Sequence, residues 1–231
     1  IRSDQTEFTI MGISASEYPE IPSVEDGTNL SLPQDTLKSM IRQTVFAVAA
    51  PGDPRPIHTG TLFEIEPNQL HLVSVDGSRL AIRGETIGSN ESFHFVVPGK
   101  TLQEVLKLLN EDTPVSLSVG RRHIILEING YSVISRLLDG EFLAYKKAIP
   151  QQISTSILVN TRALIDAVER ASLVINDRLK SPLICAFRDN QIQVSCTTPL
   201  GSVSDQIAAQ ITGNDEEMGF NSRFLLEALK N

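Results

Sequence analysis

The hydrophobic and polar positions repeat one order four times along the chain, in which a short strand pattern runs directly into an amphipathic helix pattern. In each copy, alternating apolar residues end at a Pro or Asn, and the first Leu of an apolar helix face follows four positions later. These leucines are Leu37, Leu102, Leu164 and Leu225, so that successive copies lie 65, 62 and 61 residues apart. Self-similarity at a near-constant period indicates repeats of one structural unit.

Three strand patterns, separated by turn signals, follow each of the first three helix patterns. The apolar positions from Leu37 to Val48 keep the i, i+3, i+4 spacing of one helix face, and the Pro-Gly-Asp-Pro run at 51–54 predicts the end of that helix. The third helix is expected at about 162–175. The expected strands are residues 61–65, 69–75 and 79–83, then 115–119, 123–128 and 131–137, then 183–187, 191–196 and 201–211.

Local signals refine this outline at several points. Thr101 and Glu104 predict a capping box at the start of the second helix, and Asn129-Gly130 is a strong signal for a two-residue hairpin turn. Residues 1–13 are expected to form a strand, and residues 14–28, which contain two Pro and four acidic residues, a linker.

The repeat predicts an α+β fold. One β-α-β-β-β unit cannot bury its helix face alone, whereas two such units can share a core in a domain of roughly 120 residues. We therefore expect antiparallel sheets on the outside and helices on one side. The fourth copy contains only its strand and helix before Asn231, so we expect a chain that is cut within a domain.

Composition excludes some classes of protein. The chain has 41% hydrophobic and 21% charged residues, as in ordinary soluble domains, and its apolar runs are too short for a membrane span. The net charge of −8 at pH 7 argues against a generally basic nucleic-acid-binding protein. The expected helices nevertheless carry eight basic and five acidic residues, a net charge of +3, which leaves −11 for the rest. These charges are either solvated helix faces or a local basic surface.

No catalytic or metal-binding motif is apparent in the sequence. Cys185 and Cys196 match no metal spacing and are expected to be reduced thiols. Pro98-Gly99-Lys100-Thr101 resembles the end of a P-loop, but His94 occupies the position where the motif requires Gly. We therefore expect no cofactor and no metal, although an enzyme with residues brought together only by the fold stays an alternative.

Two stretches of the first unit combine turn signals with chemistry that could bind a partner. Residues 54–60 and 75–81 each place an Arg near apolar residues at a strand end. Both stretches are explained by turns alone, but an Arg beside a Leu could also form the rim of a shallow apolar groove for a peptide.

Several blocks of residues, in the same order, resemble the bacterial DNA polymerase III β subunit, or sliding clamp, family. The blocks are Ile41–Val48, Arg55–Gly60, Asp76 with Arg79-Leu80-Ala81, Val97–Lys100 and Ser135–Gly140. The resemblance implies a non-catalytic ring-shaped homodimer in which each chain has three domains of two units. It also implies that this chain holds the end of a first domain with a linker at 1–27, a central domain at 28–150 and part of a third at 151–231.

The resemblance implies two functional surfaces. In the family, helices line a hole that encloses duplex DNA, and basic side chains facing phosphates give attraction without reading sequence. Lys100 and Lys107 match family positions that face the hole, and helix geometry adds four further basic residues. The expected DNA-facing residues are Lys38, Arg42, Lys100, Lys107, Arg162 and Arg170.

The second implied surface is a pocket that takes a hydrophobic peptide from the replicative polymerase, the clamp loader and other partners. Carried over by position, the pocket contains Arg55, His58, Val75, Gly77, Ser78, Arg79, Leu80, Leu143, Lys147 and Ala148. His58 departs from the family pattern because Leu is usual there, and Val75, Ser78 and Leu143 also depart. The resemblance implies a bacterial cytoplasmic protein associated with the nucleoid and not with a membrane. A repeat-type binding module without a DNA role is the alternative.

Overall fold

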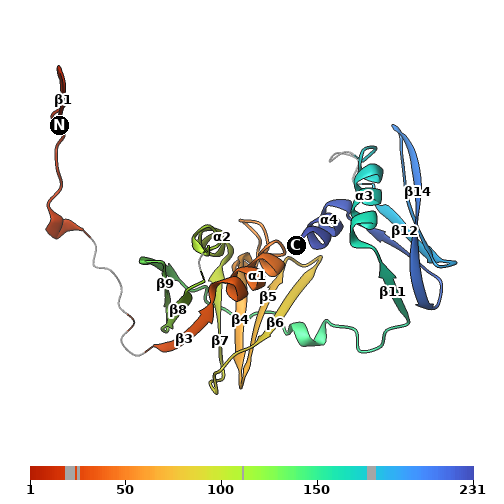
Figure 1. Cartoon of the computed structure of the whole chain (residues 1–231), viewed down its shortest axis with the longest axis horizontal. Helices are drawn as coiled ribbons and strands as arrows, with labels where there is room; N and C mark the ends of the chain where they lie inside the picture. Colours follow the sequence, from red (N-terminus) through yellow and green to blue (C-terminus); the bar gives the residue numbers. More distant parts are fainter. Residues whose placement is uncertain (19–23, 25–26, 111, 176–180) are drawn as a thin grey trace.

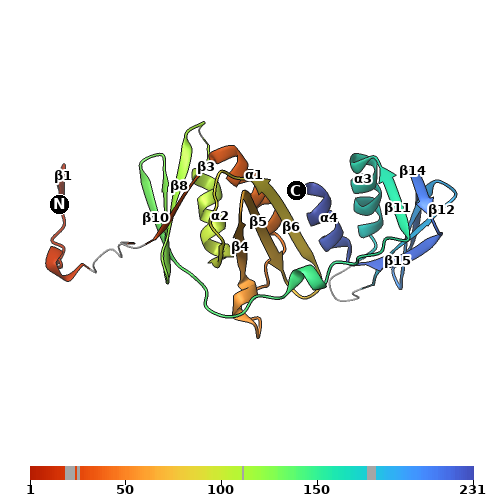
Figure 2. The ribbon, with the colours of Figure 1, turned by 90° about the horizontal axis from the view of Figure 1, so that it is seen from below.

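The computed structural model describes residues 1–18, 24, 27–110, 112–175 and 181–231. The four helices of these described residues lie along one side of the molecule, and the sheets lie outside them, so that the helices face an open concave side (Figure 1). In two perpendicular views, the last helix lies between the two central helices and the third helix (Figures 1 and 2). The helices are α1 (Gln34–Val45), α2 (Gly99–Leu108), α3 (Thr161–Ser172) and α4 (Ser222–Lys230).

The strands in the described ranges form three antiparallel sheets besides a small N-terminal hairpin. The two central sheets have the orders β10-β9-β8-β3 and β6-β5-β4-β7, and the third has the order β11-β14-β13-β12-β15. The central strands are β3 (Thr28–Pro33), β4 (Gly60–Glu66), β5 (Gln69–Val75), β6 (Leu80–Thr86), β7 (Phe93–Pro98), β8 (Pro114–Val119), β9 (His123–Ile128) and β10 (Tyr131–Arg136). The others are β11 (Thr155–Val159), β12 (Leu183–Arg188), β13 (Gln191–Thr198), β14 (Gly201–Gly213) and β15 (Glu216–Phe220).

Neighbouring units exchange their first strands. The first unit supplies β3, which pairs with β8 of the second unit, while β7 of the second unit pairs with β4 of the first, placing Phe95 opposite Phe63. In the C-terminal part, β15 pairs with β12 in the same way, with Met218 opposite Cys185. Because each sheet contains a strand of its neighbour, two successive units fold as one body.

The central core fills the space between the two helices and the two sheets. Leu37, Met40 and Ile41 of α1 are fully buried together with Leu102 and Val105 of α2. Burial of each such side chain contributes about 1.5–3 kcal/mol before the cost of ordering the chain. The i, i+3, i+4 spacing of the α1 residues is the pattern in the sequence that predicts this face.

A second and smaller core lies between α3, α4 and the five-stranded sheet. Val168 and Ala171 of α3 are buried against Val194 and Cys185 of the sheet. Helix α4 packs on this core with Leu225 and two neighbouring leucines, but none of its described residues is fully buried. Helix α4 is therefore held less by core packing than the other three helices are.

The expected α+β fold and most of its turns are confirmed. Asn129 and Gly130 have φ angles of 50° and 80°, as a two-residue hairpin between β9 and β10 requires. Asn68 and Gly77 also have positive φ angles, 61° and 89°, at the two turns expected in the first unit. No helix among the described residues is long and apolar enough to cross a membrane.

Four local expectations are wrong. Residues 1–13 form no continuous strand; they make a hairpin of two-residue strands, β1 (Arg2–Ser3) and β2 (Thr6–Glu7), because Phe8 and Ile10 have no core to pack against and are exposed. The linker expected at 14–28 lies partly outside the described residues, and Ala15–Glu17 form a 3-10 turn within it.

The other three errors concern helix ends. The expected capping box fails because α2 begins at Gly99, which puts Thr101 inside the first turn, where its hydroxyl is 2.8 Å from that of Ser135. Helix α1 ends at Val45, before Val48 and the proline run, and α3 ends at Ser172 rather than 175. The residues after each helix stay near the core in turns, so an apolar period alone overestimates helix length.

Candidate functional site

Within the part of the chain that the structure describes, three cations on the helix side have no carboxylate partner. Lys38 and Arg42 lie one turn apart on α1, and Lys100 lies at the start of α2, which packs beside α1. Among the residues that the structure describes, none of the three makes an ion pair or a side-chain hydrogen bond. Their charges are therefore available to a ligand on the concave side.

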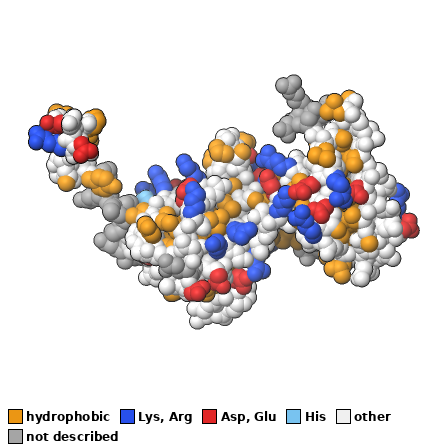
Figure 3. Space-filling view, turned by 45° about the horizontal axis from the view of Figure 1, so that its top comes forward, with side chains coloured by type: hydrophobic (Ala, Val, Ile, Leu, Met, Phe, Trp, Pro, Cys, Tyr) orange, Lys and Arg blue, Asp and Glu red, His pale blue; other side chains and the backbone are white. Residues whose placement is uncertain are grey.

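The other three expected DNA-facing residues are neutralised locally. Lys107 lies 2.7 Å from Glu104, and Arg162 lies 3.0 Å from Asp166, both within one helix. Arg170 donates from Nε to Asp205 of β14 at 2.7 Å, so its side chain reaches toward the sheet. Figure 3 shows Lys and Arg side chains interspersed with Asp and Glu over this side. The expected set of six thus divides into three free and three paired cations.

The residues expected in the peptide pocket surround a separate apolar cluster on the outer face of the β6-β5-β4-β7 sheet. Ile57, Leu62, Val73, Val96 and Tyr145 are buried there, with Leu80 and Phe142 packed against them. The alternation of side chains along β4 and β5 places these residues on the face opposite to the main core. Val75 lies on the same face and pairs with Leu80 across the β5–β6 turn.

His58 lies beside this cluster, at the end of the 3-10 turn η2 (Pro56–Thr59). Its side chain is 3% exposed and packs edge-on against Phe142, with ring centroids 5.4 Å apart. Its Nδ1 is buried without a hydrogen-bond partner. Burial, and then the nearby Arg55 charge, lower the pKa of His58, which Asp53 only partly opposes. The imidazole is therefore neutral at pH 7.

The β5–β6 turn is organised by Asp76. Its Oδ1 accepts the backbone N–H groups of Ser78 at 2.9 Å and Arg79 at 3.1 Å. A Cβ on Gly77 would lie 3.0 Å from Nη2 of Arg55, so the absence of a side chain lets Arg55 lie over the turn. The two loop stretches singled out in the sequence, 54–60 and 75–81, therefore meet in space.

Arg79 is fully engaged in contacts within the protein. Its guanidinium donates to Asp76, to Glu227 of α4 and, at 2.7 Å, to the carbonyl of Phe46. It lies 4.1 Å from the ring centroid of Phe224 and 5.4 Å from that of Phe46. The side chain is 15% exposed. Arg79 thus touches α4, which lies about 140 residues further along the chain.

The remaining expected pocket residues belong to the connecting segment, residues 137–154, which joins β10 of the central sheets to β11 of the C-terminal sheet. Leu143 and Lys147 line a cavity of about 300 Å³ together with Leu62, Phe142 and Tyr145, whereas Ala148 is exposed beyond it. The cavity opens on the outer face of β4. The structure therefore brings Leu143 and His58 to the same apolar cluster through Phe142. Arg79 lies apart from it, where the β5–β6 turn meets α4. We call this contact between the turn and α4 the joint.

The connecting segment is held on β4 by the 3-10 turn η3 (Tyr145–Lys147). The Tyr145 hydroxyl donates to Glu64 at 2.5 Å, and the Lys146 ammonium lies 3.0 Å from Glu64 and 2.8 Å from Glu66. Burial alone would raise the pKa of Glu64, but the hydrogen bonds from Tyr145 and Lys146 outweigh it and lower this pKa.

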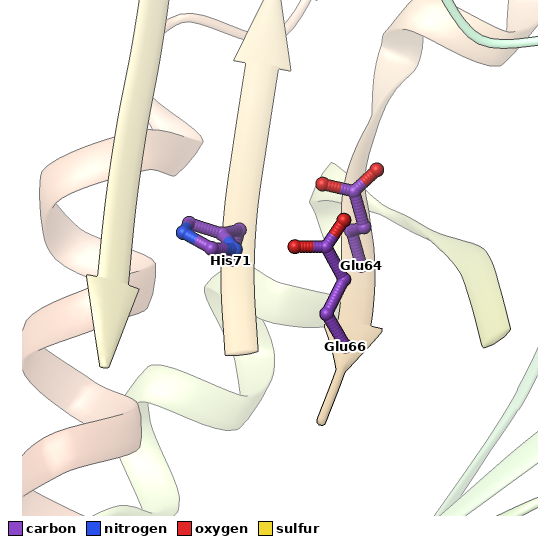
Figure 4. A group of neighbouring side chains, drawn as sticks. All are labelled: Glu64, Glu66 and His71. Atoms are coloured by element: carbon purple, nitrogen blue, oxygen red, sulfur yellow. The ribbon is translucent and has the colours of Figure 1, made fainter. Parts of the chain in front are cut away.

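One group of side chains has the composition of a metal site. Glu64, Glu66 and His71 each offer a ligand atom, and these atoms lie within 4.8 Å of one another on the same sheet face (Figure 4). The Lys146 ammonium, however, already neutralises both carboxylates. A metal ion would have to displace Lys146, so the geometry favours an internal ion pair that fastens the connecting segment.

Two family profiles match the chain in consecutive stretches. Residues 31–143 match the DNA polymerase III beta subunit, central domain, and residues 146–231 match its C-terminal domain. The chain belongs to the DNA polymerase III beta subunit family. The two matched stretches correspond to the central and the C-terminal sheets of the structure, in the same order along the chain.

Relatives of this family align along the whole chain. The beta sliding clamps of Bacillus subtilis (strain 168) and Halalkalibacterium halodurans are 35% and 33% identical, and each match covers 100% of this chain. In both cases the chain spans 62% of the length of the relative.

Solved structures of the beta subunit family have the same fold. The sliding clamp of Bacillus subtilis superposes with a TM-score of 0.92 at 34% identity, covering 99% of this chain and 62% of that chain. The DNA polymerase III subunit beta of Pseudomonas aeruginosa gives 0.89 at 26% identity, covering 98% and 62%.

Three residues at the joint with α4 were missed by the sequence analysis of this beta subunit. Phe46, Phe224 and Glu227 enclose Arg79 but were assigned no site role. Phe224 and Glu227 follow the helix pattern of the fourth copy, and no local signal marks them as different. Only the approach of α4 to the β5–β6 turn makes them part of the same site.

Proposed function

We propose that the protein is a DNA sliding clamp, a non-catalytic processivity factor of the replicative DNA polymerase. The observation that carries the proposal is the set of free cations Lys38, Arg42 and Lys100 on the concave helix side of a clamp fold. Sparse cations that face phosphates hold duplex DNA without reading its sequence, as a protein that slides requires. The acidic remainder of the chain disfavours DNA binding elsewhere.

In this proposal, residues 1–27 belong to the end of a first clamp domain and a linker. Residues 28–150 are the central domain, and residues 151–231 are part of the third. The active form is a homodimeric ring in the bacterial cytoplasm, at the nucleoid. Repetition of the strand-exchanged unit supports this assignment, because bodies built on the same plan can be joined edge to edge into a closed ring.

The ring tethers the polymerase, the clamp loader and other partners through hydrophobic peptides. The apolar cluster around Leu80, with His58 and Leu143 nearby, supports a pocket on the outer face, away from the DNA. A neutral His58 suits an apolar peptide better than a charged imidazole would, because burial of an unpaired charge is costly.

Topological linkage gives the decisive test. A clamp that contains this chain at the full length of its relatives is loaded onto a nicked circular plasmid by a clamp loader and separated by gel filtration. We expect the protein to elute with the circle and to leave the DNA after a restriction enzyme linearises it. Equal retention on circular and linear DNA would contradict encirclement and favour a binding module of another kind.

A further inference from the structure

We propose that Arg79 is a positioning residue that fixes the angle between the central domain and α4. Among the described residues, the Arg79–Glu227 contact is the only ion pair between residues 28–143 and 151–231. Helix α4 packs on the smaller core with partly buried leucines but has no fully buried residue of its own, so contacts outside that core add to what holds its orientation. This role concerns the joint between two bodies and does not require that Arg79 touches a peptide.

The central domain prepares one half of the joint. Asp76, which also caps the β5–β6 turn, accepts from Nε of Arg79 at 2.9 Å, and the Phe46 carbonyl accepts from Nη2 at 2.7 Å. These two acceptors belong to different elements, a turn and the end of α1, so they define the plane of the guanidinium. An arginine held in this way presents its remaining edge and its face in fixed directions.

Helix α4 provides the other half. Glu227 accepts from Nη1, and the Phe224 ring lies 4.1 Å from the guanidinium carbon, a distance at which a cation is attracted by the ring. The side chain of Asn221 accepts from the backbone N–H of Arg223 at 3.0 Å and so fixes where α4 begins. One contact lies at the start of α4 and the other a turn later, so together they restrain the helix axis as well as its position.

Lysine could not replace this residue. All three guanidinium nitrogens of Arg79 donate to different acceptors while the plane lies against an aromatic ring. An ammonium is a compact point charge and cannot keep these directions at once. At 15% exposure the charge is also largely removed from water, so the loss of one partner leaves the other without compensation.

The joint sets the geometry of both surfaces in the proposed function. Helix α4 continues the row of α1 and α2 along the concave side (Figure 1). Its Phe224 lies against Arg79, the residue that precedes Leu80 at the β5–β6 turn. This consequence rests on the proposed function, whereas the joint itself does not.

Distance measurement between spin labels tests the joint directly. Labels are attached at Gln103→Cys on α2 and Ala208→Cys on β14, both at exposed positions. The native Cys185 and Cys196 are buried, and burial raises the pKa of Cys185 to about 11, so they react slowly with the label. Pulsed dipolar spectroscopy of the double-labelled chain then reports the distribution of distances between the two bodies.

We expect one narrow distance distribution for the parent chain and a shifted or broadened one for Arg79→Ala. Arg79→Lys and Glu227→Gln should give intermediate widths, because each keeps part of the joint. Arg223→Ala is the matched control: Arg223 pairs with the same Glu227 at 3.1 Å but within α4, so its removal should leave the distribution unchanged.

A distribution for Arg79→Ala that equals that of the parent chain overturns the proposal, as does an equal change in Arg223→Ala. If Arg79→Ala does not fold, judged by circular dichroism, Arg79→Lys and Glu227→Gln decide in the same way. No DNA or peptide is present in these measurements. A failure of the proposed function would appear as equal retention on linear and circular DNA and would leave the distance result intact.

Discussion

At the residue scale, Gln34 is the clearest polar contribution to the central core. The side chain is 2% exposed, and its Nε2 donates to Thr113 at 2.9 Å and to Asn129 at 2.7 Å, while its Oε1 accepts the N–H of Asn110 at 3.1 Å. It therefore joins the start of α1 to the end of α2 and to the β9–β10 turn. The sequence could not reveal this role, because Asn129 lies 95 residues away.

Replacing Gln34 tests this network. In Gln34→Leu, the N–H of Asn110 loses its acceptor, whereas Asn129 loses one donor but keeps the hydrogen bond from Thr113 at 3.1 Å. A buried polar group left without a partner costs about 1–3 kcal/mol. We expect the free energy of unfolding in urea at pH 7 to fall by about 2 kcal/mol or more. Gln103→Leu, at an exposed position of α2, is the control and should change it little. Similar losses in both variants would contradict a specific network.

Glu64 makes the attachment of the connecting segment depend on pH. Burial opposes the charge of Glu64, but Tyr145 and Lys146 outweigh this and hold its pKa below the ordinary value of 4.5. A carboxyl whose pKa is lowered by folding stabilises the folded state above its unfolded pKa and loses that contribution as the pH falls through the folded pKa. Stability from this attachment is therefore present at pH 7 and is lost below about pH 4.5.

Tyr145→Phe removes one of the two donors to Glu64 without changing the ring. We expect it to lower the free energy of unfolding at pH 7 by about 1 kcal/mol, the net value of one such hydrogen bond. The difference from the parent chain should shrink as the pH is lowered from 5 to 3, since protonation removes the same interaction in both. Urea titrations across this range measure it, and a difference that stays constant would show that Glu64 is not the group involved.

At the element scale, hydrophobic periodicity predicted the units well because their faces are buried on one side. The α1 face from Leu37 to Ile41 and the Asn129-Gly130 turn are determined by residues close in sequence. Two features escaped prediction for physical reasons. Residues 1–13 have strand-like alternation but no sheet to join, and the exchange of β3 and β7 between units depends on pairings far apart along the chain.

The β9–β10 hairpin provides a test at this scale. Gly130 has a φ of 80°, where a Cβ costs about 1–2 kcal/mol, although no atom lies within 4 Å of the Cβ position. We expect Gly130→Ala to lower the free energy of unfolding by that amount through backbone strain alone. Gly88→Ala is the matched control, because Gly88 has equal space and no positive φ. A loss in Gly88→Ala as large as in Gly130→Ala would show that the positive φ of the turn is not responsible, because the lower entropy of the unfolded chain that Ala brings acts in the opposite, stabilising direction.

At the scale of the whole molecule, the sequence predicted the repeat, the fold class and an excess of basic residues on helices. It did not show that Arg170 is paired with Asp205, which lies 35 residues away on a strand, whereas Lys107 and Arg162 pair within their own helices. Nor did it show that Arg79 meets α4. Such contacts arise only when elements far apart along the chain pack against each other, so local patterns carry no record of them.

The division of the six expected DNA-facing residues into free and paired cations predicts how DNA affinity depends on salt. A cation that already has a carboxylate partner gains little from a phosphate, whereas a free one releases a counterion, and each contact contributes about 0.9 to the slope of log affinity against log salt. The variant Lys38→Gln/Arg42→Gln/Lys100→Gln should therefore lower this slope by up to about 3 for duplex DNA.

The matched control removes the same number of charges from the paired set, as Lys107→Gln/Arg162→Gln/Arg170→Gln. Fluorescence anisotropy with a labelled duplex, between 25 and 100 mM salt (roughly the range in which weak non-specific binding is measurable), gives both slopes. We expect the control to keep most of the parent slope, because its cations are neutralised within the protein. A loss in the control equal to that in the free set would mean that DNA competes successfully with Glu104, Asp166 and Asp205. The number of basic side chains, and not whether they lack a carboxylate partner within the protein, would then determine the attraction to DNA.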